Sequence, residues 1–181
     1  MKRHIVIFLL TFVCFLSGCG YGIERPPSEA DQKEEISEFS GTYVGDNSSV
    51  YGLLLSLPGG EAVDQLELTD QVLAVTYKGG GQDDSFWNEA KVKEAFMYNA
   101  IYTAILVPNA KGYQFAVGEN VLQAEPDKLR TWVMEHIGSL PEDLMNDEHV
   151  KAYVEQHAVD IAEAANSTQA QTSFYRTFPM E

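Results

Sequence analysis

One cysteine near the N-terminus stands where covalent lipid attachment is expected. Leu16-Ser17-Gly18-Cys19 follows a basic head, Lys2-Arg3-His4, and a short apolar run that starts at Ile5. A basic head, an apolar core and small residues, in this order, are typical of a secretory signal. A membrane-spanning helix needs about 20 apolar residues, so this run is too short to be one.

The quartet that ends at Cys19 resembles the bacterial lipobox. The resemblance implies that Cys19 receives a diacylglyceryl group, with fatty acyl chains such as palmitate, and becomes the mature N-terminus. Two long acyl chains hold a protein at a membrane where one chain is marginal. Plain secretion without a lipid is the alternative, but it leaves the position of the cysteine unexplained.

The remaining residues give little indication of a catalytic nucleophile or a metal site. Ser48 and Ser49 lack a surrounding Gly-x-Ser-x-Gly elbow, and helix capping explains them better. His149 and His157 are two helical turns apart, whereas a shared metal ion needs single-turn spacing. His136 falls on an apolar stripe, as His157 does, which favours hydrogen-bonded residues at the edge of a core. We expect no metal site, no cofactor and no catalytic residue.

Acidic residues are numerous but do not form a recognisable site. Asp83-Asp84 and Asp46-Asn47 do not match the alternating pattern of an EF-hand loop, and solvated loop charge accounts for them better. Glycoside hydrolysis would need two facing carboxylates, a geometry that the sequence does not reveal.

Asn99 and the segment from Tyr43 to Ser48 are the best candidates for recognition. Asn99 lies in a strongly apolar helical stretch, where its amide must find hydrogen bonds. It either ties down a loop, which we favour, or belongs to a recognition groove. The candidate set for a ligand or partner is Tyr43, Asp46, Asn47, Ser48 and Asn99, beside a neighbouring loop at residues 79–84.

The charge balance excludes one class of partner. Lys2 and Arg3 are two of the 12 basic side chains, so removal of residues 1–18 leaves 10 basic and 27 acidic side chains, a formal charge of −17. Such a surface repels phosphate backbones, and we expect no nucleic-acid partner. It also repels anionic lipids, so membrane attachment would have to come from acyl chains on Cys19.

The chain divides into four parts. We predict a signal peptide over residues 1–18, a flexible tether over 19–40, a folded domain over 41–165 and a loose tail over 166–181, in which Phe174, Tyr175 and Phe178 can dock locally. Arg25-Pro26-Pro27 and a mostly polar stretch after it favour a flexible tether. Its root-mean-square reach is about 25 Å.

The folded part is predicted to be an α+β domain. Val50, Leu53, Leu54 and Leu57 predict a helix capped by Asn47 or Ser48 and stopped at Pro58. Alternating residues predict strands at 66–69 and 73–77, joined by Asp70-Gln71, and at 113–117 and 121–123. A long helix is expected from Asn88 to Val107, and two more over 126–137 and 146–165. The order α-ββ-α-ββ-α-α predicts a four-stranded, mainly antiparallel sheet packed against helices, the long one central.

The chain resembles an uncharacterised bacterial family, domain of unknown function 4825. The resemblance runs roughly from Thr42 to Ile137 and is most specific at Tyr43-Val44-Gly45-Asp46-Asn47-Ser48. It implies a lipoprotein of a Gram-positive bacterium or an extracytoplasmic part of a membrane protein, because family members are mostly of these kinds. Some members resemble antibiotic-sensing peptidases, but no catalytic residue of the family is established, and none is transferred here.

These features predict a function outside the cytoplasm. We expect a lipoprotein on the outer face of the cell membrane that acts as a non-enzymatic binding or sensing module for an envelope protein or a wall-derived ligand. The alternatives are an envelope hydrolase that uses acidic residues and a purely structural lipoprotein.

Overall fold

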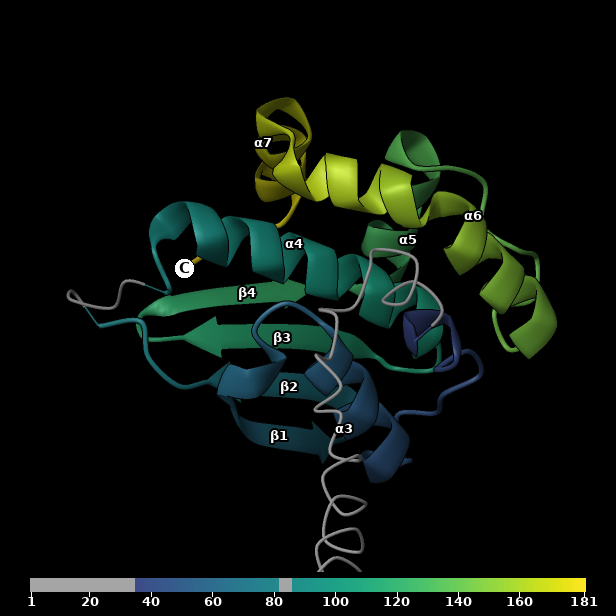
Figure 1. Cartoon of the computed structure of the whole chain (residues 1–181), viewed down its shortest axis with the longest axis horizontal. Helices are drawn as coiled ribbons and strands as arrows, with labels where there is room; N and C mark the ends of the chain where they lie inside the picture. The colour runs from purple at the N-terminus through teal and green to yellow at the C-terminus, as the bar shows by residue number, and fades with distance from the viewer. Residues whose placement is uncertain (1–34, 82–85) are drawn as a thin grey trace, which may run out of the picture.

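The protein consists of a four-stranded β-sheet with helices packed on it (Figure 1). The computed structural model describes residues 35–81 and 86–181. The strands are β1 (Val63–Thr69), β2 (Val72–Tyr77), β3 (Gly112–Val117) and β4 (Asn120–Ala124), in the order β1-β2-β3-β4. β1 with β2 and β3 with β4 are antiparallel, whereas β2 and β3 are parallel. The predicted α+β fold with a mainly antiparallel sheet is therefore confirmed. The parallel pair arises because the chain crosses from β2 to β3 through a helix.

The first hairpin turns where the sequence predicts it. Asp70 and Gln71 both have positive φ, 54° and 64°. Two successive residues in the left-handed region form a turn whose twist matches that of the flanking strands. The register that follows pairs Leu66 with Val75 and Leu68 with Leu73, so that their side chains share the face that the helices cover.

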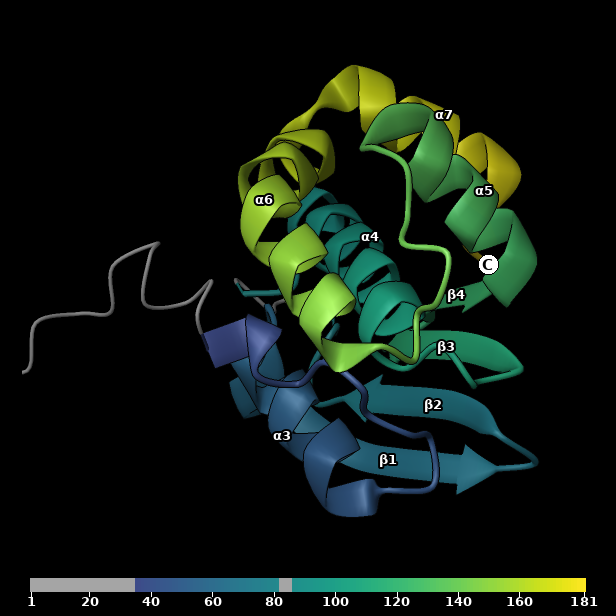
Figure 2. The ribbon, with the colours of Figure 1, turned by 90° about the vertical axis from the view of Figure 1, so that its right-hand side faces the viewer.

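The long helix α4 (Glu89–Leu106) is the centre of the core. Its N-cap is Asn88, whose side chain accepts a hydrogen bond from the backbone nitrogen of Lys91. Twelve of its residues are buried, from Val92 to Leu106. Burial on more than one side follows from its position, since α4 lies between the sheet and the outer helices (Figure 2).

Four further helical segments surround this centre. They are α3 (Asn47–Ser56), the short 3₁₀ helix η1 (Gly60–Ala62), α5 (Pro126–His136) and α6 (Asp147–Asn166). Proline stands at the first turn of α5, as expected. The N-cap of α3 is Asp46 rather than the predicted Asn47 or Ser48, because the helix begins one residue earlier than expected.

The predicted loose tail is wrong, because it forms an ordered part of the domain. Residues Thr168–Thr177 form helix α7, with Ser167 as its N-cap. Phe174 is fully buried and Phe178 is 3% exposed. Beyond the helix, Val121 and Glu181 exchange two backbone hydrogen bonds of 2.9 Å, which lays the chain end along β4. Packing of two aromatic rings at i and i+4 thus holds a segment that is otherwise polar.

The folded domain also begins earlier than residue 41. Ile36 is 3% exposed and belongs to the hydrophobic core. Next to it, the Ser37 hydroxyl donates to a Glu155 carboxylate oxygen of α6 at 3.4 Å, and Lys151 of α6 forms an ion pair with Glu38. One isoleucine among polar residues shows no periodicity, so the sequence alone does not reveal this anchoring.

Some predictions fall outside the described residues. These are the signal peptide, Cys19, the tether up to residue 34 and the pair Asp83-Asp84. Among residues 35–81 and 86–181, no helix is both long enough and apolar enough to cross a membrane.

Candidate functional site

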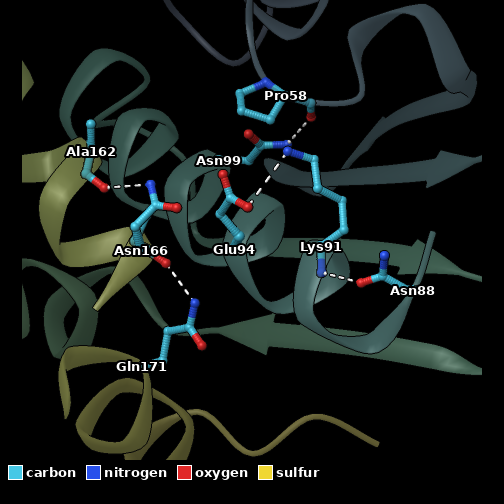
Figure 3. A network of polar contacts seen from close by, with 9 residues as sticks. Pro58, Asn88, Lys91, Glu94, Asn99, Ala162, Asn166 and Gln171 are labelled. Atoms are coloured by element: carbon cyan, nitrogen blue, oxygen red, sulfur yellow. Dashed lines mark hydrogen bonds and ion pairs between the residues drawn. The ribbon is translucent and has the colours of Figure 1, made fainter. Parts of the chain in front are cut away.

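A groove of about 520 Å³ runs between α4 and α6. Ten residues from four segments of the chain line it: Ile36, Pro58, Glu94, Tyr98, Tyr102, Ala158, Val159, Ala162, Glu163 and Asn166. We call it the tyrosine groove. Figure 3 shows part of its surroundings, with Pro58 and Glu94 on one side and Ala162 and Asn166 of α6 on the other. Its volume lies within the range of small-ligand sites.

The groove exists because large and small side chains face each other across two helices. Tyr98 and Tyr102 are four residues apart on α4, so they lie one above the other on the same face. Ala158 and Ala162 have the same spacing on α6. Alanine side chains leave a hollow that the two tyrosine rings only partly fill.

The two tyrosines supply an aromatic surface with polar ends. Their ring centroids are 4.8 Å apart at an angle of 44°. Tyr102 is 1% exposed, whereas Tyr98 is partly exposed. Burial raises the pKa of both hydroxyls above the ordinary value, so both tyrosines stay neutral at physiological pH. Tyr98 can therefore offer a ligand a hydrogen bond and part of its π-face, whereas the ring of Tyr102 is buried behind the surface.

Carboxylates are the only charged groups that line the tyrosine groove. Glu94 forms an ion pair with Lys91 at 3.5 Å, with side chains 30% and 38% exposed. Glu163 is exposed and has no hydrogen bond or ion pair among the residues that the structure describes. An unpaired carboxylate beside an apolar floor is suited to a cation that also has an apolar part.

Asn99 lies next to the groove, in the core, and has the structural role that the sequence favours. Its amide nitrogen donates to the carbonyl oxygen of Pro58 at 3.0 Å and to the hydroxyl of Tyr77 at 2.8 Å. The side chain is fully buried, and its amide oxygen has no partner within the described part of the chain. Asn99 thus ties the segment after α3 to α4 through Pro58 (Figure 3). Its bond to Tyr77 ties α4 to β2 of the sheet.

The predicted turn from Tyr43 to Ser48 is only partly available for recognition. Asp46 caps α3: it accepts from the Ser49 nitrogen at 3.1 Å and from the Ser49 hydroxyl at 2.8 Å. These bonds lower the pKa of the Asp46 carboxyl. Tyr43 is 56% exposed, and Asn47 and Ser48 are exposed as well.

The turn does not share a surface with residues 79–81, which corrects the expected adjacency. The backbone nitrogen of Val44 donates to the Asn109 side chain at 2.9 Å, just beyond the end of α4 and before the start of β3. At the far end of β3, a Cβ placed on Gly80 would lie 2.9 Å from the backbone nitrogen of Gly118. A six-residue strand is about 20 Å long, so the two segments lie at opposite ends of the sheet. Nor does Asn99, in the middle of α4, join the turn.

A second hollow, of about 570 Å³, contains a Ser–His pair that the sequence did not reveal. The Ser173 hydroxyl lies 3.0 Å from Nε2 of His136, and Nδ1 of His136 lies 2.9 Å from the carbonyl oxygen of Trp132. The imidazole stacks on the Trp132 indole with centroids 4.1 Å apart. His136 is thus hydrogen-bonded, as expected, but it is exposed rather than partly buried at the edge of the core.

This pair has a nucleophile, a base and an orienting carbonyl, but its surroundings oppose acyl transfer. Asp160 and Glu163 line the same hollow, and their carboxylates would repel the negative charge that develops on a substrate oxygen. We therefore assign the Ser173–His136 contact to the packing of α7 on α5.

The other histidine on an apolar stripe also has a partner. Nδ1 of His157 lies 2.8 Å from a carboxylate oxygen of Asp160, and its ring packs on Tyr153. Within the described ranges, no group of three or more His, Cys, Asp or Glu side chains is placed to hold a metal ion.

Comparison with known families gives one match. The family described as "Domain of unknown function (DUF4825)" matches residues 36–127. No curated protein and no solved structure matches the chain. The matched region begins at the buried Ile36 and ends in the first turn of α5, so it contains α3, the sheet and α4, while α6 and α7 lie beyond it. The chain belongs to the DUF4825 family.

Proposed function

We propose that this chain is a lipoprotein, anchored through a diacylglyceryl group on Cys19 to the outer face of a Gram-positive cell membrane, whose domain is a non-enzymatic binding or sensing module. The signal segment and the Leu16-Ser17-Gly18-Cys19 quartet support the anchor. A polar tether between Cys19 and Ile36 would let the domain reach partners beside the membrane. The partner class is an envelope protein or a wall-derived ligand.

The tyrosine groove is the observation that carries the binding function. It combines an apolar floor, the partly exposed ring of Tyr98 and the unpaired carboxylate of Glu163, which is the composition of a ligand site. We therefore place the binding site on the face between α4 and α6 rather than on the turn predicted from the sequence. Tyr43, Asn47 and Ser48 remain a secondary surface at the start of α3.

The alternative of an envelope hydrolase fits the groove less well. Acid–base catalysis by two carboxylates needs at least one of them in a water-poor setting. Glu163 is exposed and Glu94 is already paired with Lys91, so neither has that setting. A purely structural lipoprotein would leave the groove without an occupant.

Photo-crosslinking from the groove tests the proposal in the native host. A photoreactive phenylalanine replaces Val159, which is 45% exposed in the groove, or Met134, which is 49% exposed on α5 outside it. We expect a defined adduct from position 159 and none from position 134, because a bound partner covers the groove. A third variant carries the photoreactive phenylalanine at Asn166, which also lines the groove. An adduct from position 166 but not from 159 would mean that steric bulk at 159 prevents binding.

Two results would contradict the binding function. One is the absence of any adduct from both 159 and 166. The other is an adduct of the same mass and yield from 134, which would show random encounter.

A further inference from the structure

The charge pattern of the tyrosine groove identifies a class of ligand. Among its ten lining residues there is no lysine, arginine or histidine, and both charged side chains, Glu94 and Glu163, are acidic. A ligand with an anionic group would face repulsion from Glu163, which has no ion pair within the described part of the chain, while Lys91 compensates only Glu94. The groove therefore selects for positive charge.

The floor of the groove adds a requirement for apolar surface. Val159 is 45% exposed, and Ala158 and Ala162 lie beside it on α6. A partly exposed tyrosine ring such as that of Tyr98 attracts a cation to its face and an aliphatic chain to its edge. Lysine and arginine side chains have this dual character, since an aliphatic stem carries the charged head.

The extent of the groove along two helices is compatible with a peptide. Its lining spans α4 from Glu94 to Tyr102 and α6 from Ala158 to Asn166, which is about 12 Å along each helix. Amphipathic peptides bind in grooves of this kind by placing successive side chains along them.

We infer that the occupant of the tyrosine groove is a cationic amphipathic peptide, whose apolar side chains lie on Tyr98 and Val159 while its basic heads pair with Glu163 and Glu94. This inference rests on the proposed function, since it assumes that the groove is the binding site. The Lys91–Glu94 pair does not block it, because an exposed ion pair is weak and a ligand cation can replace Lys91. The formal charge of −17 that remains without residues 1–18 would also steer such a peptide toward the domain.

A binding titration with matched charge variants tests the inference. Residues 19–181, whose only cysteine is Cys19, are immobilised through that sulfur. The probe is a synthetic 12-residue amphipathic peptide of leucine and lysine. The groove variant is Glu94→Gln with Glu163→Gln. The control is Glu119→Gln with Glu142→Gln, two exposed glutamates outside the groove that give the same change in net charge.

We expect the groove variant to raise the Kd by about fivefold and the control to raise it by less than about twofold, since each exposed ion pair contributes little but the two act together. Val159→Ser is expected to raise the Kd by about threefold, and Met134→Ser to leave it unchanged. Replacing lysine by glutamine in the peptide should raise the Kd at least as much as the groove variant does, because it removes the same ion pairs.

Equal loss of affinity in the two charge variants would overturn the inference, because binding would then depend on net charge alone. Tight binding of the glutamine peptide, or no binding of the lysine peptide, would overturn it as well. If crosslinking from position 159 still gives a defined adduct in any of these cases, the proposed binding function stands and only the ligand class is wrong.

Discussion

Replacing Phe174 with alanine is expected to lower the free energy of unfolding by about 3–5 kcal/mol, as truncation of a fully buried aromatic side chain does. Phe174 has no exposed surface and contacts the rings of Trp132 and Phe178, with centroids 5.3 Å and 5.0 Å away. Its loss leaves a cavity between α5 and α7. Urea denaturation of the variant, followed by circular dichroism, measures the change.

Arg176→Ala provides the control for this prediction. Arg176 is exposed in the last turn of the same helix, and its removal should change stability by less than about 0.5 kcal/mol. An equally small effect of Phe174→Ala would mean that residues 168–181 do not pack on the domain, and the assignment of α7 to the core would be wrong.

The second large effect is expected at Asn99. Asn99→Leu removes both hydrogen bonds that the amide nitrogen donates, so the part-buried Pro58 carbonyl and the buried Tyr77 hydroxyl lose this partner. The expected loss is about 2–4 kcal/mol, since each unsatisfied buried group costs about 1–3 kcal/mol and removal of the unpaired amide oxygen offsets part of the loss. Denaturant unfolding measures the loss.

A double-mutant cycle separates the two hydrogen bonds. Tyr77→Phe removes only the hydroxyl and should cost about 1 kcal/mol. In the Asn99→Leu background the same change should cost less, because the bond is already absent. Crosslinking from position 159 should persist in Asn99→Leu. Unchanged stability together with a lost adduct would instead give Asn99 a recognition role.

The sequence predicts the elements of this fold well where local signals are strong. Asn88 caps the long helix, Asp70-Gln71 makes the first turn, and Pro126 starts α5, each at the expected place. Each of these features depends on one or two residues and on backbone geometry alone. These features can therefore be predicted without knowing which distant segments of the chain pack together.

The features that the sequence missed depend on packing between distant segments. Ile36 and Phe174 are buried by partners that are far away in the chain, so the polar residues around them predict a tether and a tail. The tyrosine groove has the same origin, because its two walls come from α4 and α6. A local signal was present, namely small residues at Ala158 and Ala162 and tyrosines at Tyr98 and Tyr102, but only the packing sets them opposite each other.

The predicted recognition turn illustrates a different limit. Asp46 has the residue type of a ligand-binding acid, yet its oxygens accept from Ser49 and cap α3. Asn99 is an unusual polar residue in an apolar helix, and its donors are fully used inside the core. Residue type and position mark both residues as special, but their hydrogen bonds assign them to structure.

Mass spectrometry of the mature N-terminus, taken from the membrane fraction of the native host, is the most direct test of the proposed anchored module. We expect an N-terminal fragment that starts at Cys19 and carries a diacylglyceryl group, and we expect Cys19→Ser to release the protein from that fraction. An unmodified sulfur on Cys19, or wild-type protein that fractionates with the cytosol, would contradict the account.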